Sequence, residues 1–212
     1  EELVAIRHCT FVMGPPAAGK STCWRTLQRT RAIRTPQTPT MTVDVNPKAV
    51  PTAELYGYLT LATREWKDGL LSSVMRDLGQ IEDENPKWII LDGDLDANWI
   101  ENMNSVMDDN RLLTLASNER IRLLVNMKML FEIRDLAFAS PATVTRAGVL
   151  YITDDNQWKN YVQAWINDWA ANLTLPRSGE KLREQFKSAA EELFEKYVPP
   201  TLLTIALEYK HI

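Results

Sequence analysis

Short runs of apolar residues, each bounded by polar or turn-forming residues, recur along the first 152 positions of the chain. Runs of this length without helical spacing are typical of strands that are buried on both faces of a sheet. The stretches between them are long enough to hold helical or loop crossovers. We therefore predict a parallel α/β sheet of five strands, at residues 8–13, 41–45, 85–92, 128–133 and 148–152.

Apolar residues at three- and four-residue spacing predict the helices that accompany this sheet. Good helix formers without Gly or Pro extend from Lys20 to about Arg31. Two further helices are expected in residues 64–81 and 97–109. Their apolar stripes consist of Trp66, Leu70, Leu71, Val74 and Leu78 in the first, and of Ile100, Met103 and Met107 in the second.

Two stretches interrupt the alternation of strand and helix. Residues 46–63 are rich in turn-forming residues and irregular, which favours a loop or an insertion. Residues 112–123 hold two short alternating runs about the sequence ASNE, which predicts a β-hairpin. Hairpins are unusual additions to a doubly wound sheet, so we interpret both stretches as departures from its regular pattern.

The pattern becomes purely helical beyond Thr153. Three helical runs are predicted, at residues 156–169, 178–198 and 199–212, and the Pro199-Pro200 pair is expected to end the second of them. The chain is therefore predicted to consist of an α/β domain at residues 1–153 and a helical segment at 154–212, the start of a smaller lobe.

Composition narrows the possible partners. The chain has 45% apolar and 25% charged residues and a net charge of −4, as in ordinary globular proteins. The chain has no run of about 20 apolar residues, the length that crosses a bilayer, and it has no basic patch of the kind that binds nucleic acid. We expect neither a membrane span nor a nucleic-acid partner, and the N-terminus has no signal-peptide pattern.

The two cysteines carry no metal-binding signature. Cys9 lies in a predicted strand and Cys23 in a predicted helix, without CxxC spacing or a cluster of histidines. We interpret both as small buried hydrophobic residues of a protein from a reducing compartment, not as zinc ligands.

The sequence GPPAAGKS at 14–21 matches the phosphate-loop pattern G-x-x-x-x-G-K-[ST], and it lies between a predicted strand and a predicted helix. Backbone N–H groups of such a loop and the positive end of the helix point at phosphates. Lys20 is then expected to contact the β and γ phosphates, and Ser21 to coordinate Mg²⁺. The predicted nucleotide-binding residues are Gly14, Pro15, Pro16, Ala17, Ala18, Gly19, Lys20, Ser21 and Thr22.

Asp92 ends an apolar strand, where a carboxylate can hold Mg²⁺ beside Ser21. Hydrolysis also needs a group that activates the attacking water. In hexameric ATPases and related motors a glutamate normally follows the aspartate, and here that position is Gly93. Asp94 and Asp96 are possible substitutes, although Asp94 fits a second metal-side or structural carboxylate better. Loss of a positioned base costs about 10²–10⁴ in rate, so we expect slow hydrolysis.

Arg146 precedes the last predicted strand, within the sequence SPATVTRAG. A guanidinium at this place is either a surface charge or an arginine finger that reaches a nucleotide on a neighbouring module. The spacing alone leaves both interpretations open.

Taken together, these stretches resemble the AAA+ family, and in particular the second AAA+ module of a dynein heavy chain. The resemblance covers most of residues 8–152. It rests on GPPAAGKSTCW, LDGDLDANWIENMNSVMDDN with the LTLASNERI hairpin, and FEIRDLAFASPATVTRAGVLYI. The residues of these stretches are more similar to those of axonemal outer-arm chains than to those of the cytoplasmic chain. The resemblance implies a three-layer α/β/α P-loop fold and, at 154–212, the start of an incomplete helical small subdomain.

The resemblance also implies a function. Dynein heavy chains hold six AAA+ modules in one ring; the first hydrolyses ATP, and the second binds it and largely keeps it. The implied ligands are ATP or ADP with Mg²⁺, and Arg146 would serve the nucleotide of the preceding module as an arginine finger. Residues 46–63 and 112–123 match insertions that face the linker. The implied partners are the neighbouring modules and the linker, with microtubules only indirectly, in the cytoskeleton of a ciliary or flagellar axoneme.

Two positions depart from the family pattern. Ala17 stands where most AAA+ loops have Gly, so a positive φ there would strain the loop. The γ-phosphate-sensing residue, usually Asn, falls at about Arg134-Asp135, after an unusual Glu132. Two other functions stay open: an active P-loop ATPase or small-molecule phosphotransferase that uses Asp94 or Asp96, and an interaction scaffold with a vestigial phosphate loop.

Overall fold

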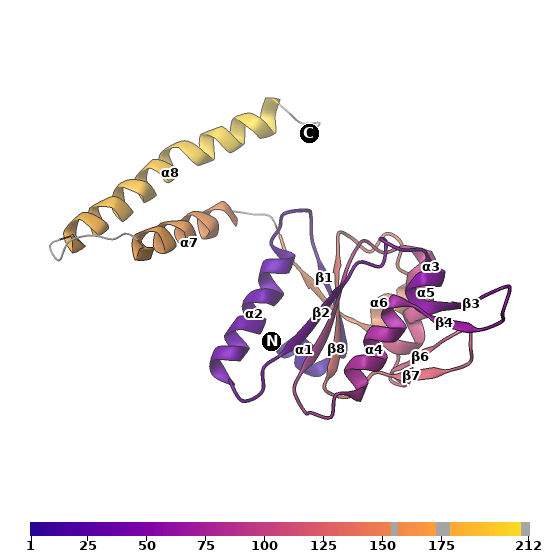
Figure 1. The fold of residues 1–212 in the computed structure, drawn as a ribbon. Coiled ribbons are helices and arrows are strands. Elements are labelled where there is room, and N and C mark those ends of the chain that lie inside the picture. Colours follow the sequence, from indigo (N-terminus) through magenta and orange to yellow (C-terminus); the bar gives the residue numbers. More distant parts are fainter. Residues whose placement is uncertain (154–156, 173–178, 209–212) are drawn as a thin grey trace. The chain divides into compact units, whose positions relative to one another are not determined.

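The computed structural model of the protein describes residues 1–153, 157–172 and 179–208. The chain divides into two units, Glu1–Asp154 and Asp155–Ile212, and each is described by itself below. The first unit contains the strands and the second contains two helices (Figure 1).

A five-stranded parallel sheet forms the centre of the first unit, with the strand order β2-β5-β8-β1-β9. The register places Met13 beside Ile133, and Asp92 beside Glu132, so these strands reach the same edge of the sheet. All five predicted strands are confirmed: β1 (Cys9–Met13), β2 (Met41–Val45), β5 (Lys87–Asp92), β8 (Met127–Ile133) and β9 (Gly148–Tyr151).

Helices cover both faces of this sheet, which confirms the three-layer α/β/α fold (Figure 1). On one face α2 (Lys20–Arg34) packs Trp24 against Trp88, Ile90 and Leu130, and α1 (Glu2–Ile6) adds Val4. The other face carries the larger core, where α4 (Leu70–Gln80) and α5 (Ala97–Met107) cover the alternate strand residues. Because strand side chains alternate between faces, residues two apart belong to the same layer. This larger core includes Leu71, Met75, Leu78, Ile89, Leu91, Ile100, Met103, Met107, Met129 and Phe131.

Helix α4 is shorter than its apolar spacing predicts. It begins at Leu70, and Trp66 lies in a strand instead. Gly69 is the N-cap of the helix. The Leu55 backbone packs so closely against it that a Cβ there would lie 2.4 Å away, which leaves room only for glycine. The predicted stripe is therefore only partly correct: Leu71 and Leu78 are buried and Val74 packs against the core, whereas Leu70 is 44% exposed.

Two hairpins extend from the larger core. The predicted hairpin at 112–123 is confirmed as antiparallel β6 (Leu112–Thr114) and β7 (Arg120–Arg122). The turn-rich stretch expected to be irregular holds α3 (Thr52–Tyr56) and the first strand of a second hairpin, β3 (Gly57–Leu59) with β4 (Trp66–Asp68).

Arg76 of α4 links the two hairpins by ion pairs. Its guanidinium lies 2.6 Å from Asp68 Oδ2 at the end of β4 and 3.0 Å from Glu119 Oε2 in the turn between β6 and β7. The Arg76 hydrogen bond holds the pKa of Asp68 below its usual value. A single side chain therefore couples two segments that are more than 40 residues apart in the sequence.

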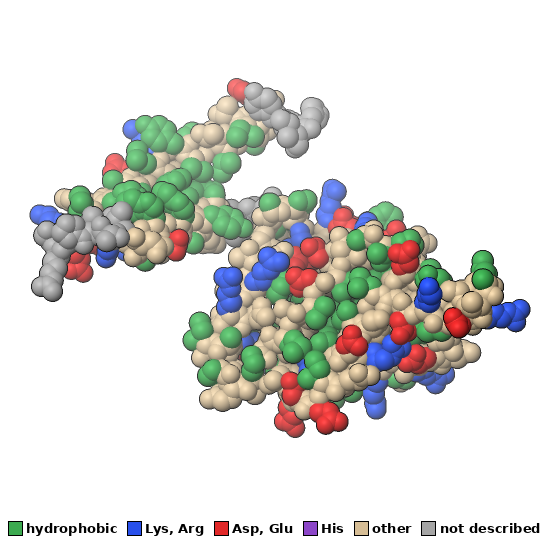
Figure 2. Space-filling model, viewed as in Figure 1, with side chains coloured by type: hydrophobic (Ala, Val, Ile, Leu, Met, Phe, Trp, Pro, Cys, Tyr) green, Lys and Arg blue, Asp and Glu red, His purple; other side chains and the backbone are tan. Residues whose placement is uncertain are grey.

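The second unit pairs α7 (Gln157–Asn172) with α8 (Glu180–Glu208). Trp169 stacks on Phe186 with ring centroids 3.6 Å apart, and Ile166 is fully buried. Figure 2 shows many apolar side chains on the visible face of this unit. Exposed apolar residues on its helices include Tyr161, Trp165, Leu182, Leu193, Tyr197, Leu202, Leu203, Ile205 and Leu207.

The expected end of a helix at Pro199-Pro200 is wrong, because α8 continues through both prolines to Glu208. A proline removes one backbone donor from a helix and crowds the preceding turn. The residues of this stretch are exposed, so water can satisfy the carbonyl groups that lose their partners, and the Thr204 hydroxyl donates to the Pro200 carbonyl at 2.9 Å. The last predicted residues, 209–212, lie outside the described residues.

Two other expectations can be compared with the fold. Among the described helices, none combines the length and the apolar character that a bilayer crossing requires. Cys9 is fully buried, and this burial raises the pKa of its thiol to about 12. Cys23 is exposed on α2, so its interpretation as a buried hydrophobic residue is wrong.

Candidate nucleotide-binding site

The phosphate loop joins β1 to α2 at the carboxyl edge of the sheet. The Gly14 N–H donates to the Ile133 carbonyl at 3.2 Å, which ties the start of the loop to the end of β8. A Cβ at Gly14 would lie 2.3 Å from the Ile152 carbonyl oxygen after β9, so only glycine fits here. Gly19 precedes α2 with a φ of 92°, a value that favours glycine.

Ala17 adopts a φ of 63°, in the left-handed region. This is the condition under which the sequence predicts strain, since a Cβ in this region costs roughly 1–2 kcal/mol. The Ala17 side chain is exposed, so the strain arises from its own backbone and not from crowding.

Lys20 points its ammonium group back into the loop. Nζ donates to the carbonyl oxygens of Gly14 and Pro15, at 2.8 Å each. An ammonium group has three donors, so these two bonds leave one for a phosphate oxygen. The first turn of α2 thus places a positive charge beside its own N-terminus, where the helix dipole also favours an anion.

Ser21 and Trp24, one helical turn apart on α2, share a partner on β8. The Ser21 hydroxyl donates to Glu132 Oε2 at 2.6 Å, and the Trp24 indole Nε1–H donates to Glu132 Oε1. Glu132 is only 4% exposed. No role for Glu132 was predicted, although a charged residue within the apolar run KMLFEI is a signal that could have marked it.

Asp92 lies on the α2 face of the sheet beside Glu132. The two residues are register partners, and each follows by two positions a residue that packs against α2, Ile90 and Leu130 respectively. Ser21 and Asp92 thus bring a hydroxyl and a carboxylate oxygen to one region, a donor set that suits Mg²⁺, with Glu132 beside them. No group of three or more His, Cys, Asp or Glu in the described part of the chain could hold a metal alone. Mg²⁺ is usually held by one or two carboxylates with phosphate oxygens and water.

The carboxylates after Asp92 are engaged elsewhere. Asp94 Oδ1 accepts a hydrogen bond from the Arg134 backbone N–H at 2.9 Å, which favours its interpretation as a structural carboxylate. Asp96 is the N-cap of α5 and accepts from the Asn98 N–H at 2.8 Å. Between them and Asp92, Gly93 donates its N–H to the Glu132 carbonyl at 3.2 Å.

The position expected to sense the γ-phosphate has no side chain of the usual kind. Arg134 is exposed, and its guanidinium lies 3.8 Å from Asp135. The other Asp135 oxygen accepts from the Ala137 N–H at 3.0 Å. Local contacts thus engage both side chains, while the Arg134 backbone N–H donates to Asp94.

Arg146 lies at the opposite edge of the sheet from the phosphate loop. It ends α6 (Pro141–Arg146), and the following strand starts at Gly148, which pairs with Thr10 at the beginning of β1. The loop begins after the other end of β1, roughly 10 Å away at about 3.3 Å per residue. Arg146 Nε donates to Asp108 Oδ1. The structure therefore separates Arg146 from the phosphate loop of its own chain.

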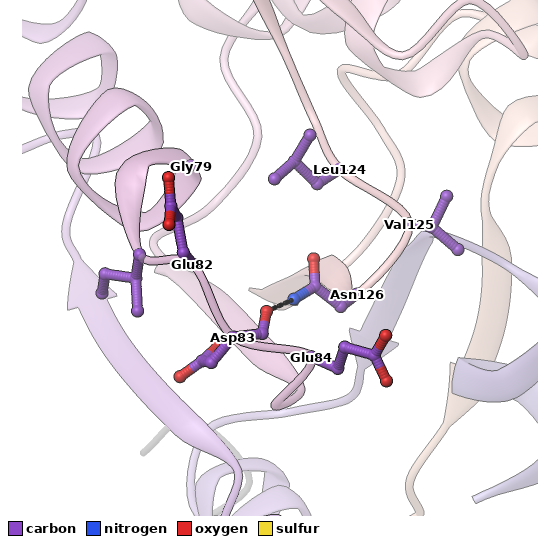
Figure 3. A pocket seen from close by; sticks show the side chains of 8 residues that line it. Gly79, Glu82, Asp83, Glu84, Leu124, Val125 and Asn126 are labelled. Atoms are coloured by element: carbon purple, nitrogen blue, oxygen red, sulfur yellow. Dashed lines mark hydrogen bonds between the residues drawn. The ribbon is translucent and has the colours of Figure 1, made fainter.

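A cavity of about 610 Å³ also lies at this amino edge (Figure 3). It is lined by residues that precede β5 and β8, including Glu82, Asp83 and Leu124. Asn126 Nδ2 donates to the Asp83 carbonyl at 3.0 Å across it. Ligands of open α/β sheets bind at the carboxyl ends of the strands, so this cavity is distinct from the candidate nucleotide site.

Comparisons of the sequence with known proteins point to one family. Residues 10–147 match the family described as AAA domain, dynein-related subfamily. The whole chain is 51% identical to part of the dynein alpha chain of the flagellar outer arm of Chlamydomonas reinhardtii. It is 48% identical to part of human dynein axonemal heavy chain 9 and 47% identical to part of the ciliary dynein beta chain of Tripneustes gratilla. The chain spans only 4–5% of the length of these relatives.

Proposed function

Because this chain belongs to the dynein-related subfamily of AAA domains, we propose that it is a nucleotide-binding module in the motor ring of an axonemal dynein heavy chain. The identity of about half its residues to outer-arm and ciliary chains supports the assignment to the axoneme of a cilium or flagellum. The LDGD stretch and the hairpin that follows it resemble those of the second dynein module, which supports a place as the second module of the ring. Its partners would then be the neighbouring modules and the linker, with microtubules reached only through the whole motor.

The proposed ligand is ATP or ADP with Mg²⁺. Lys20 would donate to the β and γ phosphates, and residues 14–22 would surround the phosphate chain. Ser21 and Asp92 would hold Mg²⁺, which screens the negative charge of the phosphates when it is bound. Residues 154–212 would begin the helical small subdomain, and the segments 46–63 and 112–123 would face the linker.

We further propose that the module holds its nucleotide with little or no hydrolysis. The observation that carries this proposal is the arrangement after Asp92. Gly93 has no side chain, and both following carboxylates accept hydrogen bonds from backbone N–H groups at Arg134 and Asn98. A base must lie within hydrogen-bond reach of the attacking water, and these bonds draw Asp94 and Asp96 towards the protein backbone.

Arg146 is proposed to act on the nucleotide of the preceding module. At the amino edge Arg146 is too far from the module's own phosphate loop to contact a nucleotide there. Its guanidinium has further N–H donors besides Nε, which is bonded to Asp108. Asp108 would then hold the guanidinium in place while its terminal nitrogens face outward. A finger of this kind is worth about 10³–10⁵ in rate.

Identifying the retained nucleotide tests the proposed function directly. The purified chain is denatured, and the released nucleotide is separated by ion-exchange chromatography. We expect roughly one ATP or ADP per chain, and a melting temperature that rises on addition of Mg·ATP. Nucleotide at 100 times its Kd stabilises the fold by about 2.7 kcal/mol. Absence of nucleotide together with an unchanged melting temperature would favour the scaffold instead, and phosphate release near ~1 s⁻¹ would favour an active ATPase.

A further inference from the structure

Glu132 is a buried carboxylate whose partners are neutral. It is 4% exposed, and its oxygens accept hydrogen bonds from the Ser21 hydroxyl and the Trp24 indole. The ion pairs among the described residues include none with Glu132, and the nearby Lys20 ammonium is bonded to loop carbonyls instead. Burying a charge is costly unless it is paired, so this carboxylate lies where a cation would be stabilised.

The direction of the Ser21 bond is informative. The Ser21 hydroxyl donates its single hydrogen to Glu132 Oε2, which accepts it at 2.6 Å. Both lone pairs of Ser21 Oγ then stay available to coordinate a cation. Partners of this kind fix the orientation of a metal ligand without touching the metal themselves.

The same bonds exclude Glu132 as a replacement for the missing base. A base needs a free oxygen within reach of the attacking water. Each Glu132 oxygen already accepts a hydrogen bond from α2, one from Ser21 and one from Trp24, and these bonds hold the carboxylate against that helix. The charge of Glu132 therefore acts on the metal side of the site and not on the water side.

We infer that Glu132 is a positioning residue for the divalent cation of the bound nucleotide. It holds the Ser21 hydroxyl in the orientation that leaves its lone pairs free, and its negative charge adds to that of Asp92 on the same face of the sheet. This inference rests on the proposed nucleotide binding, which it deepens. It predicts that the affinity of this module for ATP depends strongly on Mg²⁺, and that Glu132 accounts for much of the dependence.

Glu132→Gln tests the inference with almost no change in shape. One amide oxygen can accept from Trp24, and the amide NH₂ group then donates to Ser21 Oγ and occupies a lone pair. Substitutions of groups that orient metal ligands cost about 10–100-fold in affinity. We expect the Kd of the 212-residue chain for ATP in Mg²⁺ to rise by about that factor, with the Kd for ATP in EDTA unchanged. Both constants are measured by isothermal titration calorimetry.

Three further variants make the result specific. Glu101→Gln removes the same charge from an exposed site on α5 and should leave both constants unchanged. Ser21→Ala should weaken binding in Mg²⁺ but not in EDTA, and adding Glu132→Gln to Ser21→Ala should cost little more, because the two residues act together. Ser21→Ala also gives a test that does not depend on the folding of the Glu132 variant.

Each outcome separates the two claims. Equal loss of affinity in Mg²⁺ and in EDTA for Glu132→Gln would assign Glu132 a merely structural role and overturn the inference. Unchanged affinity of Glu132→Gln for ATP in Mg²⁺ would overturn the inference as well. The proposed function would stand in both cases, provided that the wild-type chain binds ATP. Failure of the wild-type chain to bind ATP under either condition would overturn the proposed function, and the inference with it.

Discussion

The two edges of the parallel sheet hold their buried charges in different ways. At the carboxyl edge, Glu132 accepts hydrogen bonds only from neutral groups of α2. At the amino edge, Lys87 is fully buried at the start of β5, and its ammonium lies 3.0 Å from Asp83. Arg146 is likewise paired at that edge, with Asp108. At the amino edge Lys87 and Arg146 each have a carboxylate partner within the chain, whereas the buried Glu132 at the carboxyl edge has no cationic partner among the described residues.

This difference relates charge to role. A buried ion is stabilised by a partner of opposite charge, as Asp83 is for Lys87. A carboxylate that keeps neutral partners marks a place where the positive charge arrives with a ligand. The difference leads to four tests, given from the largest expected effect to the smallest.

Arg146→Ala should act at a distance from the module's own nucleotide. In a heavy chain that carries this module beside its preceding neighbour, we expect phosphate release by that neighbour to fall by about 10³-fold or more, because a finger no longer stabilises the transition-state charge. The affinity of the 212-residue chain for Mg·ATP should not change. Arg29→Ala, which removes an exposed guanidinium from α2, serves as the control. A loss of affinity in the Arg146 variant itself would contradict the separation of the two edges.

Gly93→Glu should introduce the missing base at the carboxyl edge. A Cβ there lies 3.2 Å from Asn46 Oδ1 and 3.2 Å from Pro47 Cδ, so these neighbours need to move by only a few tenths of an ångström. We expect single-turnover hydrolysis of ATP to rise by on the order of 10²-fold, the lower end of what a positioned base supplies. Gly93→Gln has the same size without a basic oxygen and should stay slow. Equal rates in the two variants would show that the absent base does not limit hydrolysis.

Lys20→Ala should weaken Mg·ATP binding by about 10–100-fold, since a hydrogen bond to a charged group is worth about 1.5–3 kcal/mol. Calorimetric titration measures this change, and the rise in melting temperature with Mg·ATP should shrink in parallel. The matched control is Lys128→Ala, at the amino end of β8, where Nζ donates to the Arg7 carbonyl at 3.4 Å. Similar losses for both lysines would mean that affinity follows net charge and not position.

His8 should make the stability of the amino edge depend on pH. Burial lowers the pKa of its imidazole, and Nε2 lies 3.0 Å from the Val106 carbonyl. The unfolded chain takes up a proton below about pH 6.5, whereas the folded chain does not until a lower pH. Stability from this group is therefore present above pH 6.5 and is lost as the pH falls below it. Melting temperatures between pH 7.5 and about 5.5 should fall less for His8→Gln than for the wild type; parallel curves would contradict this.

Much of the fold could be predicted from local pattern. The five core strands, α2, α5 and the hairpin at 112–123 agree with their predicted positions, because apolar spacing reflects which faces are buried. The prediction was wrong where a tertiary contact overrides the spacing. Trp66 has helical spacing with Leu70, yet Gly69 packs against the Leu55 backbone. The helix therefore begins only at Leu70, and Trp66 stays in β4.

The candidate site divides in the same manner. The phosphate loop lies within eight consecutive residues, and its Gly and Lys positions express local backbone and charge requirements. The Ser21–Glu132 bond joins residues 111 positions apart, and the Arg146–Asp108 pair joins residues 38 apart. A single sequence has no signal that pairs such distant residues.

A phosphate loop between a strand and a helix, an aspartate at the end of a buried strand and a glycine after it could all be recognised in the sequence. Those features depend on neighbours along the chain. The contact between Glu132 and Ser21, and the distance of Arg146 from its own loop, become visible only in the folded chain. The reason is the strand order, because placing β8 between β5 and β1 brings the end of β8 beside both Asp92 and the phosphate loop.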